Sequence, residues 1–140
     1  MKRQTKRAHV AVLAAMVLAT VPAHAQGISG DVIKIGVMND QSGPYADNCG
    51  PGSVAAARFA VEDAGGAING KKIEIVIADD QNKPDVGTAT AQKWVDADGV
   101  DAIVGCSTSA IALAVSDIMK ERKKPYMLAG TASSASIFRW

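Results

Sequence analysis

The 140-residue sequence predicts an α/β fold built on an open, parallel β-sheet. Short apolar segments typical of strands alternate with longer helical segments, and this alternation favours crossover connections that leave the strands parallel. Each strand-like segment is followed by a loop of small polar residues. Because ligands bind outside the carboxyl ends of the strands in such sheets, this second observation predicts a binding site at one edge of the sheet.

Four segments rich in β-branched and aliphatic residues predict the strands. They are residues 32–38, 72–78, 102–105 and 125–128. The polar loops that follow them are residues 39–46, 79–84, 106–109 and 130–134. With a helix in each interval, the chain is predicted to form a Rossmann-like β-α-β-α-β-α-β unit.

Three helices are predicted between the strands. The first covers about residues 52–64 and ends at Gly65-Gly66, since glycine accommodates the left-handed turn beyond a helix. The second covers about residues 85–96 and follows Pro84, which favours a helix start. The third covers about residues 109–123, with apolar side chains recurring on one face.

Large apolar side chains on the first two helices, Phe59 and Trp94, are expected to be packing residues. The cations at residues 120–124 fall in the last turn of the third helix, where they complement the helix dipole. We therefore interpret this basic run as a solvated helix end and not as a phosphate or lipid site.

The first 25 residues predict a secretory signal peptide. Residues 1–7 carry four basic side chains and no acidic one, an apolar run follows from Val10 to Val21, and Ala23-His-Ala25 is a small-x-small cleavage site. The apolar run is much shorter than the roughly 20 residues that span a membrane. We expect cleavage after Ala25 and export to the periplasm, with an uncleaved membrane anchor as the less favoured alternative.

Residues 26–140 predict a single domain with eleven basic and fourteen acidic side chains. The segment has no basic stripe with interleaved aromatic residues, so nucleic-acid binding is not expected. Both histidines lie in the leader, and the sequence has neither a Gly-x-Ser-x-Gly nor a Gly-x-Gly-x-x-Gly motif. We therefore expect no enzymatic activity, no cofactor and no metal.

The alternation of strands and helices stops after the fourth predicted strand. We therefore expect residues 26–140 to form an incomplete domain. The last strand, residues 125–128, is expected to expose an unpaired edge and an apolar face, and the segment to behave poorly in isolation.

Residues 33–134 resemble the periplasmic solute-binding proteins of branched-chain amino acid ABC transporters. The matching segments are residues 35–45, 52–63, 68–75, 79–85 and 101–105, then Ser107-Thr108 and the loop from Gly130 to Ser134. The resemblance implies a two-lobed type I periplasmic-binding fold, of which residues 26–140 would be the incomplete N-terminal lobe. It implies capture of branched-chain amino acids or related small carboxylate or amide solutes, delivery to an ABC permease, and a monomeric full-length protein.

The resemblance also implies roles for individual residues. The position matching Ser107 gives a hydroxyl to the ligand carboxylate, beside Thr108. The position matching Ser133 gives a hydroxyl and a backbone N–H, and the one matching Thr131 gives a backbone carbonyl to the ligand ammonium. Ser107 and Thr108 precede a helix whose free N–H groups favour an anion, although helix capping alone would also explain them. Tyr45 either walls the pocket or covers its own turn.

Cys49 and Cys106 follow the first and third predicted strands. If those strands are neighbours, the thiols could meet, and an exported compartment favours their oxidation; the bond would stabilise the fold by about 4 kcal/mol. Two unpaired thiols are the equally weighted alternative. Some family members have a disulfide from the position of Cys106 to the loop after the second strand, where this chain has Asn82. We interpret Asp79 and Asp80 as loop-capping or structural residues.

Two other functions remain open for the sequence. The same fold serves ligand-sensing receptors, because fold alone does not decide function. A non-functional truncated fragment is the other alternative.

Overall fold

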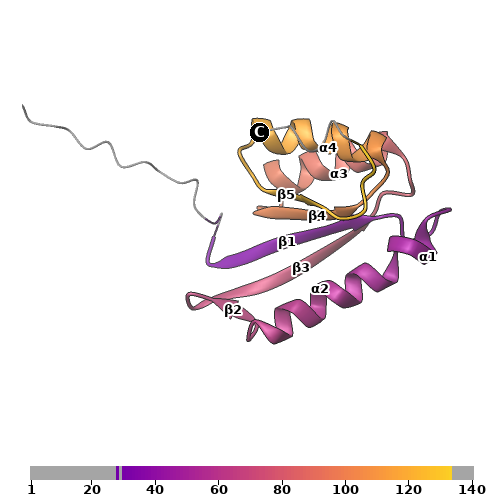
Figure 1. Ribbon diagram of the computed structural model, residues 1–140. Coiled ribbons are helices and arrows are strands. Elements are labelled where there is room, and N and C mark those ends of the chain that lie inside the picture. Colours follow the sequence, from indigo (N-terminus) through magenta and orange to yellow (C-terminus); the bar gives the residue numbers. More distant parts are fainter. Residues whose placement is uncertain (1–27, 29, 134–140) are drawn as a thin grey trace, which may run out of the picture.

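The computed structural model describes residue 28 and residues 30–133, which form a sheet covered by helices on both faces (Figure 1). The predicted leader, residues 1–25, and Ser134 lie outside the described residues. Among the helices that are described, none is long and apolar enough to cross a membrane.

The sheet has five strands in the order β2-β3-β1-β4-β5. The strands are β1 (Val32–Asn39), β2 (Ala67–Ile68), β3 (Lys71–Asp79), β4 (Ala102–Cys106) and β5 (Tyr126–Leu128). The four longer strands run parallel, which confirms the predicted sheet and the neighbouring positions of β1 and β4. The two-residue β2 was not predicted. It pairs antiparallel with β3 across the turn at Asn69-Gly70, where both residues have positive φ.

The helices are α1 (Ala46–Cys49), α2 (Pro51–Asp63), α3 (Pro84–Asp96) and α4 (Ser109–Glu121). The three long helices lie within two residues of their predicted bounds, because their start and stop residues are strong local signals. The single-turn α1 was not predicted. It lies in the loop after β1, where Gly50 separates it from α2.

The basic end of α4 is partly paired and not simply solvated. The Arg122 guanidinium donates to both carboxylate oxygens of Asp96 at the end of α3, over 2.7 and 3.1 Å. This ion pair lowers the pKa of Asp96 and joins the two helices at the edge of the sheet far from the strands' carboxyl ends.

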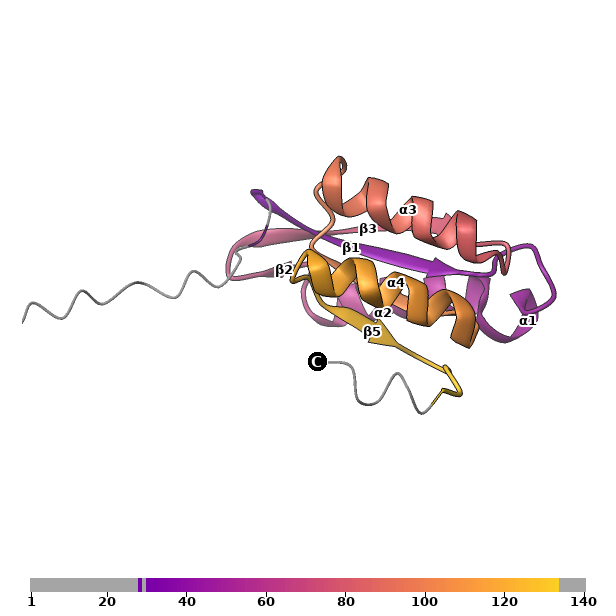
Figure 2. The ribbon, with the colours of Figure 1, turned by 90° about the horizontal axis from the view of Figure 1, so that it is seen from above.

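The main hydrophobic core lies between the sheet and the helices α3 and α4, which run side by side over one face (Figure 2). Trp94 is buried there, as predicted, and α4 contributes the apolar face expected from its sequence. The buried members of this core are Met38, Ala91, Trp94, Val100, Ile103, Ile111, Val115 and Met119.

The face of the sheet that α2 covers is packed much more loosely. None of the thirteen residues of α2, all of which are described, is buried. An apolar groove of about 440 Å³ lies between the alanine-rich side of α2 and the sheet, reaching Met127 on β5. Phe59 does not line this groove and is 64% exposed, so the prediction that it is a packing residue was wrong. Alanine side chains are too short to fill the space that a larger residue would occupy.

Candidate ligand-binding site

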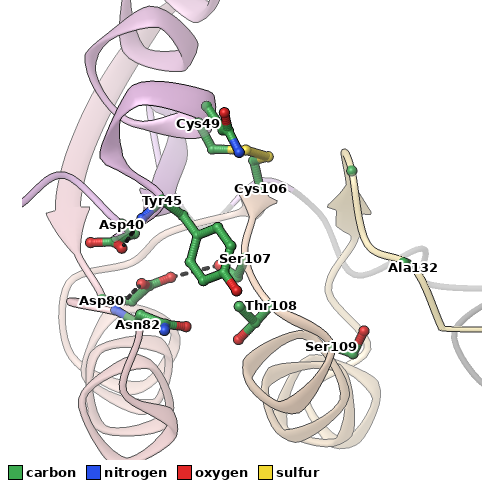
Figure 3. A pocket seen from close by; sticks show the side chains of 12 residues that line it. Asp40, Tyr45, Cys49, Asp80, Asn82, Cys106, Ser107, Thr108, Ser109 and Ala132 are labelled. Atoms are coloured by element: carbon green, nitrogen blue, oxygen red, sulfur yellow. Dashed lines mark hydrogen bonds between the residues drawn. A yellow bond between two sulfur atoms is a disulfide. The ribbon is translucent and has the colours of Figure 1, made fainter. Parts of the chain in front are cut away.

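A pocket of about 390 Å³ lies outside the carboxyl ends of the parallel strands (Figure 3). The loops after β1, β3, β4 and β5 all contribute to it, as the sequence predicted from the polar residues that follow each strand. Its described lining residues are Asp40, Tyr45, Asn48, Cys49, Asp80, Asn82, Cys106, Ser107, Thr108, Ser109, Gly130 and Ala132.

The structure brings together three of the five residues expected to contact a ligand. Tyr45, Ser107 and Thr108 line the pocket, with the Tyr45 ring extending over the other two (Figure 3). Tyr45 is 44% exposed, so it forms a wall open to solvent and does not cover a core. From the loop after β5, the pocket is lined by Gly130 and Ala132, while the side chains of Thr131 and Ser133 are not among the lining groups.

The Thr131 side chain forms a hydrogen bond with the neighbouring loop, which follows β4. Its hydroxyl donates to the backbone carbonyl of Ser107 over 3.3 Å, which links the loops after β4 and β5. This contact is compatible with the expected role of Thr131, since that role uses the backbone carbonyl and leaves the hydroxyl free for other partners.

The position of Tyr45 is determined by a buried carboxylate at the end of β1. Asp40 accepts hydrogen bonds from the backbone N–H groups of Gly43, at 2.5 Å, and Tyr45, at 2.9 Å. A β-carbon on Gly43 would lie 2.5 Å from this carboxylate, so only glycine allows the loop to wrap around Asp40 so closely. The buried Asn39 side chain donates to the carbonyls of Cys49 and Gly50 and holds the far end of the same loop.

Cys49 and Cys106 are joined by a disulfide in the structure, with their α-carbons 5.6 Å apart. The bond is possible because β1 and β4 are neighbours, with Asn39 opposite Cys106 in the register. It attaches the end of α1 to the end of β4 at the rim of the pocket (Figure 3). The loop that carries Tyr45 is therefore tied to the sheet by a covalent bond.

Asp80 makes a contact within the pocket that sequence reasoning missed. One oxygen of its carboxylate accepts the backbone N–H of Asn82 at 2.9 Å, which is the expected loop-capping role. The other accepts the Ser107 hydroxyl at 2.6 Å (Figure 3). The two residues are 27 positions apart, and only the pairing of β3 and β4 on either side of β1 brings them together. No local sequence signal could have indicated this contact.

Asp79 caps the neighbouring loop. Its carboxylate accepts the backbone N–H groups of Gln41 and Gln81 and the hydroxyl of Ser42, over 2.5–2.9 Å. Slight burial acts to raise the pKa of Asp79, but these hydrogen bonds outweigh it and lower the pKa below its ordinary value. Carboxylate oxygens of Asp40, Asp79 and Asp80 lie within 4.8 Å of one another. All three carboxylates accept hydrogen bonds from loop groups or from Ser107, in agreement with the structural interpretation of Asp79 and Asp80.

Below the pocket, the hydroxyl of Tyr126 is buried and has no hydrogen-bond partner among the described residues. It lies over Gly105, where a β-carbon would approach the hydroxyl oxygen to 2.8 Å. Burial raises the pKa of Tyr126 well above its ordinary value; the neighbouring Ser107 side chain acts to lower this pKa and Asp80 to raise it, and burial is the largest effect.

Thr108 occupies the position before the first residue of α4, but its side chain makes no capping hydrogen bond. Helix capping, the alternative explanation for this residue, is therefore not what the Thr108 hydroxyl does in the structure. The first turn of α4 faces the pocket with the N–H groups that a helix leaves unpaired.

An open parallel sheet with a small pocket outside its strand ends is the arrangement of an α/β ligand-binding domain. Residues 32–140 match the family model described as "Periplasmic binding protein". The chain belongs to this family, which confirms the resemblance found in the sequence.

Relatives and solved structures agree with this assignment. The chain is 36% identical over 92 residues to "Leu/Ile/Val-binding protein homolog 3" of Brucella melitensis, an alignment that covers 64% of this chain and 24% of the relative. It is 44% identical to a periplasmic binding protein of Burkholderia mallei, with a TM-score of 0.73 and coverage of 75% and 28% of the two chains.

A third similar protein was solved with a ligand. It is the branched-chain amino acid transporter substrate-binding protein of Streptococcus pneumoniae in complex with isoleucine. The two share 27% identity and a TM-score of 0.68, over 75% of this chain and 30% of that one. These neighbours confirm the predicted type I periplasmic-binding fold. The chain spans about a quarter of the length of the relatives it matches.

Proposed function

We propose that this chain supplies the first-lobe half of the ligand site in the substrate-binding component of an ABC importer. The ligands would be branched-chain amino acids or related small carboxylate or amide solutes. The observation that carries the proposal is the meeting of Tyr45, Ser107 and Thr108 in one pocket outside the strand ends. The isoleucine complex of the Streptococcus pneumoniae neighbour supports an amino acid as the first ligand to test.

The start of α4 supports a role in binding a carboxylate. A helix N-terminus carries a partial positive charge and unpaired N–H donors, both of which favour an anion. The Thr108 hydroxyl is available beside these donors, because it does not cap the helix. Several hydrogen bonds of about 1.5–3 kcal/mol each would be needed for micromolar affinity, which corresponds to about 8 kcal/mol. A second lobe would supply the remaining contacts.

Export and transport follow as further parts of the proposal. Residues 1–25 would direct the protein to the periplasm and be removed after Ala25, so that the exported protein would begin at Gln26. The mass of that protein tests this cleavage site directly. A permease complex would then receive the ligand from the closed protein.

The binding test uses the protein at the length that the cell exports. Its affinity for isoleucine, leucine and valine is measured by titration calorimetry, and weak binding by NMR titration. Thr108→Ala is expected to reduce affinity about tenfold, through loss of one hydrogen bond near the carboxylate. Thr88→Ala on the exposed side of α3 is the matched control, since Thr88 bonds only to its own helix.

Two results would overturn the proposal. One is a folded protein that binds none of the three amino acids, nor the related amides and carboxylates, at millimolar concentration. The other is binding that Thr108→Ala and Thr88→Ala leave equally unchanged, since the ligand would then lie outside this pocket.

A further inference from the structure

The hydroxyl of Tyr126 is the one buried side-chain polar atom without a hydrogen-bond partner among the residues that the structure describes. The ring that carries it packs against the main core, between the sheet and the helices α3 and α4. Buried polar atoms in proteins are nearly always paired, so an exception calls for a physical explanation. The groups that surround this hydroxyl supply one.

The Tyr126 hydroxyl reaches the sheet just before β4 leads into the pocket. A β-carbon on Gly105 would lie 2.8 Å from the hydroxyl oxygen and 3.1 Å from ring carbon Cε2, so Tyr126 fits only over a residue without a side chain. The same point lies 3.1 Å from the Met38 carbonyl, and that carbonyl is 3.5 Å from the Ser107 hydroxyl. The Tyr126 hydroxyl therefore ends beside Ser107, below the pocket.

Two buried polar side chains lie near this hydroxyl. Ser107 is 6% exposed and donates to Oδ2 of Asp80 over 2.6 Å, and Asp80 is 1% exposed. Burial has the largest effect on the pKa of Tyr126 and raises it, while the Ser107 side chain acts to lower this pKa and the charge of Asp80 to raise it. Hydroxyl and carboxylate oxygens each offer two lone pairs, so the Ser107–Asp80 pair can accept a further hydrogen bond.

The ligand contact expected of Ser107 creates a need for another donor. Ser107 has a single hydrogen, which it donates to Asp80 in the structure, whereas the family resemblance implies a hydrogen bond from Ser107 to the ligand carboxylate. If this hydrogen turned toward the ligand with no replacement, an oxygen of a buried carboxylate would lose its donor, and such a loss is costly. The hydrogen of the Tyr126 hydroxyl is not used elsewhere in the described structure and can take its place.

We propose that Tyr126 is a positioning residue of the ligand site, whose hydroxyl donates to the Ser107–Asp80 pair when Ser107 donates to a ligand carboxylate. Tyr126 is not among the lining residues of the pocket, so it acts on the ligand through Ser107. Gly105 belongs to the same arrangement, because the hydroxyl occupies the space that a side chain there would need. This inference rests on the proposed function and deepens it by adding a residue outside the pocket.

The variant Tyr126→Phe removes the hydroxyl and keeps the ring. Titration calorimetry or NMR titration of the exported protein gives its affinity for isoleucine, leucine and valine. The affinity is expected to fall about fivefold, because Ser107 must then leave Asp80 without a donor in order to bind the ligand. Met119→Leu, a volume-conserving change in the same core near the end of α4, is the matched control. Its affinity should stay within about twofold of the wild type.

Two further measurements separate positioning from packing. In a Ser107→Ala background, Tyr126→Phe should cause no further loss of affinity, because the hydroxyl acts only through Ser107. A packing role would instead cause the same loss in both backgrounds. Without ligand, Tyr126→Phe should leave the midpoint of chemical denaturation unchanged or raise it, since the hydroxyl has no hydrogen bond to lose.

The possible failures are distinguishable. Equal affinities of Tyr126→Phe and the wild type, or a loss that persists in full without the Ser107 hydroxyl, overturn this inference and leave the proposed function standing. If Ser107→Ala does not fold, Tyr126→Phe alone decides: lower affinity with an unchanged midpoint supports the inference, and a lower midpoint contradicts it. A wild-type protein that binds none of the three amino acids overturns the proposed function and this inference together.

Discussion

The ring of Trp94 lies directly on the backbone of Gly36. A β-carbon on Gly36 would be 2.6 Å from Cε3 of the ring, closer than any real packing contact. Gly36 is in the middle of β1, the central strand, and Trp94 is near the end of α3. The spacing of α3 from the sheet, and with it the position of the loops at the strand ends, therefore depends on the absence of a side chain at Gly36.

Gly36→Ala is expected to destabilise the protein by about 1–3 kcal/mol, because the added methyl group must displace a buried ring. Chemical denaturation measures the free energy of unfolding. Gly52→Ala on α2 is the control, since nothing lies within 4 Å of a β-carbon there and alanine is the better helix former. Equal stability of Gly36→Ala and the wild type would show that α3 can move away from the sheet without cost.

The disulfide predicts a protein without free thiols. Thiol titration of the unreduced, denatured protein should detect none, whereas two thiols per molecule would contradict the bond. Replacing both Cys49 and Cys106 by serine should lower the free energy of unfolding by about 2–4 kcal/mol, since the bond closes a long loop of the unfolded chain. A reducing agent should destabilise the wild type and leave this double variant unchanged.

Tyr126 predicts a loss of stability in alkali. The unfolded chain releases the phenol proton near the ordinary pKa of 10.0, while the folded protein retains it because burial raises the pKa. The folded state then binds more protons, so its stability falls as the pH rises above 10, by up to about 1.4 kcal/mol per pH unit. Stability measured from pH 8 to 11 should fall less steeply in Tyr126→Phe. Parallel profiles would show that the hydroxyl ionises freely in the folded protein.

The exposed strand β5 predicts self-association of residues 26–140 when they are produced alone. Met127 on this strand is 51% exposed and lines the apolar groove, and β5 lies at the edge of the described sheet. Met127→Lys should reduce the apparent mass measured by light scattering, because an edge charge opposes strand pairing. Phe59→Lys on α2 is the control, since Phe59 is also exposed but lies on a helix and does not line the groove. A monomeric wild-type segment that melts cooperatively would contradict this prediction.

Local signals in the sequence predicted most of the elements that build the site. The parallel strands were evident from apolar segments in regular alternation with helices, and the long helices from residues such as Pro84 and Gly65. The elements that were missed, α1 and β2, are a single turn and a two-residue strand. Such short elements are stabilised by their surroundings, so they leave little pattern in the sequence.

The predicted packing of the helices was correct on one face of the sheet only. Trp94 and Phe59 have the same chemical character, yet Trp94 lies against Gly36 while Phe59 is in solvent. Burial depends on what stands opposite a side chain, and this is a property of two distant segments together. A single helix sequence does not contain that information.

The sequence by itself determined the class of fold, the edge of the sheet where a ligand would bind, and the residue types gathered there. Each of these follows from short-range periodicity and from the geometry of parallel strands. Only the tertiary structure decided which residues meet: Cys49 with Cys106 across β1 and β4, and Asp80 with Ser107 across three strands. Those contacts depend on strand order and register, which arise when the whole sheet packs.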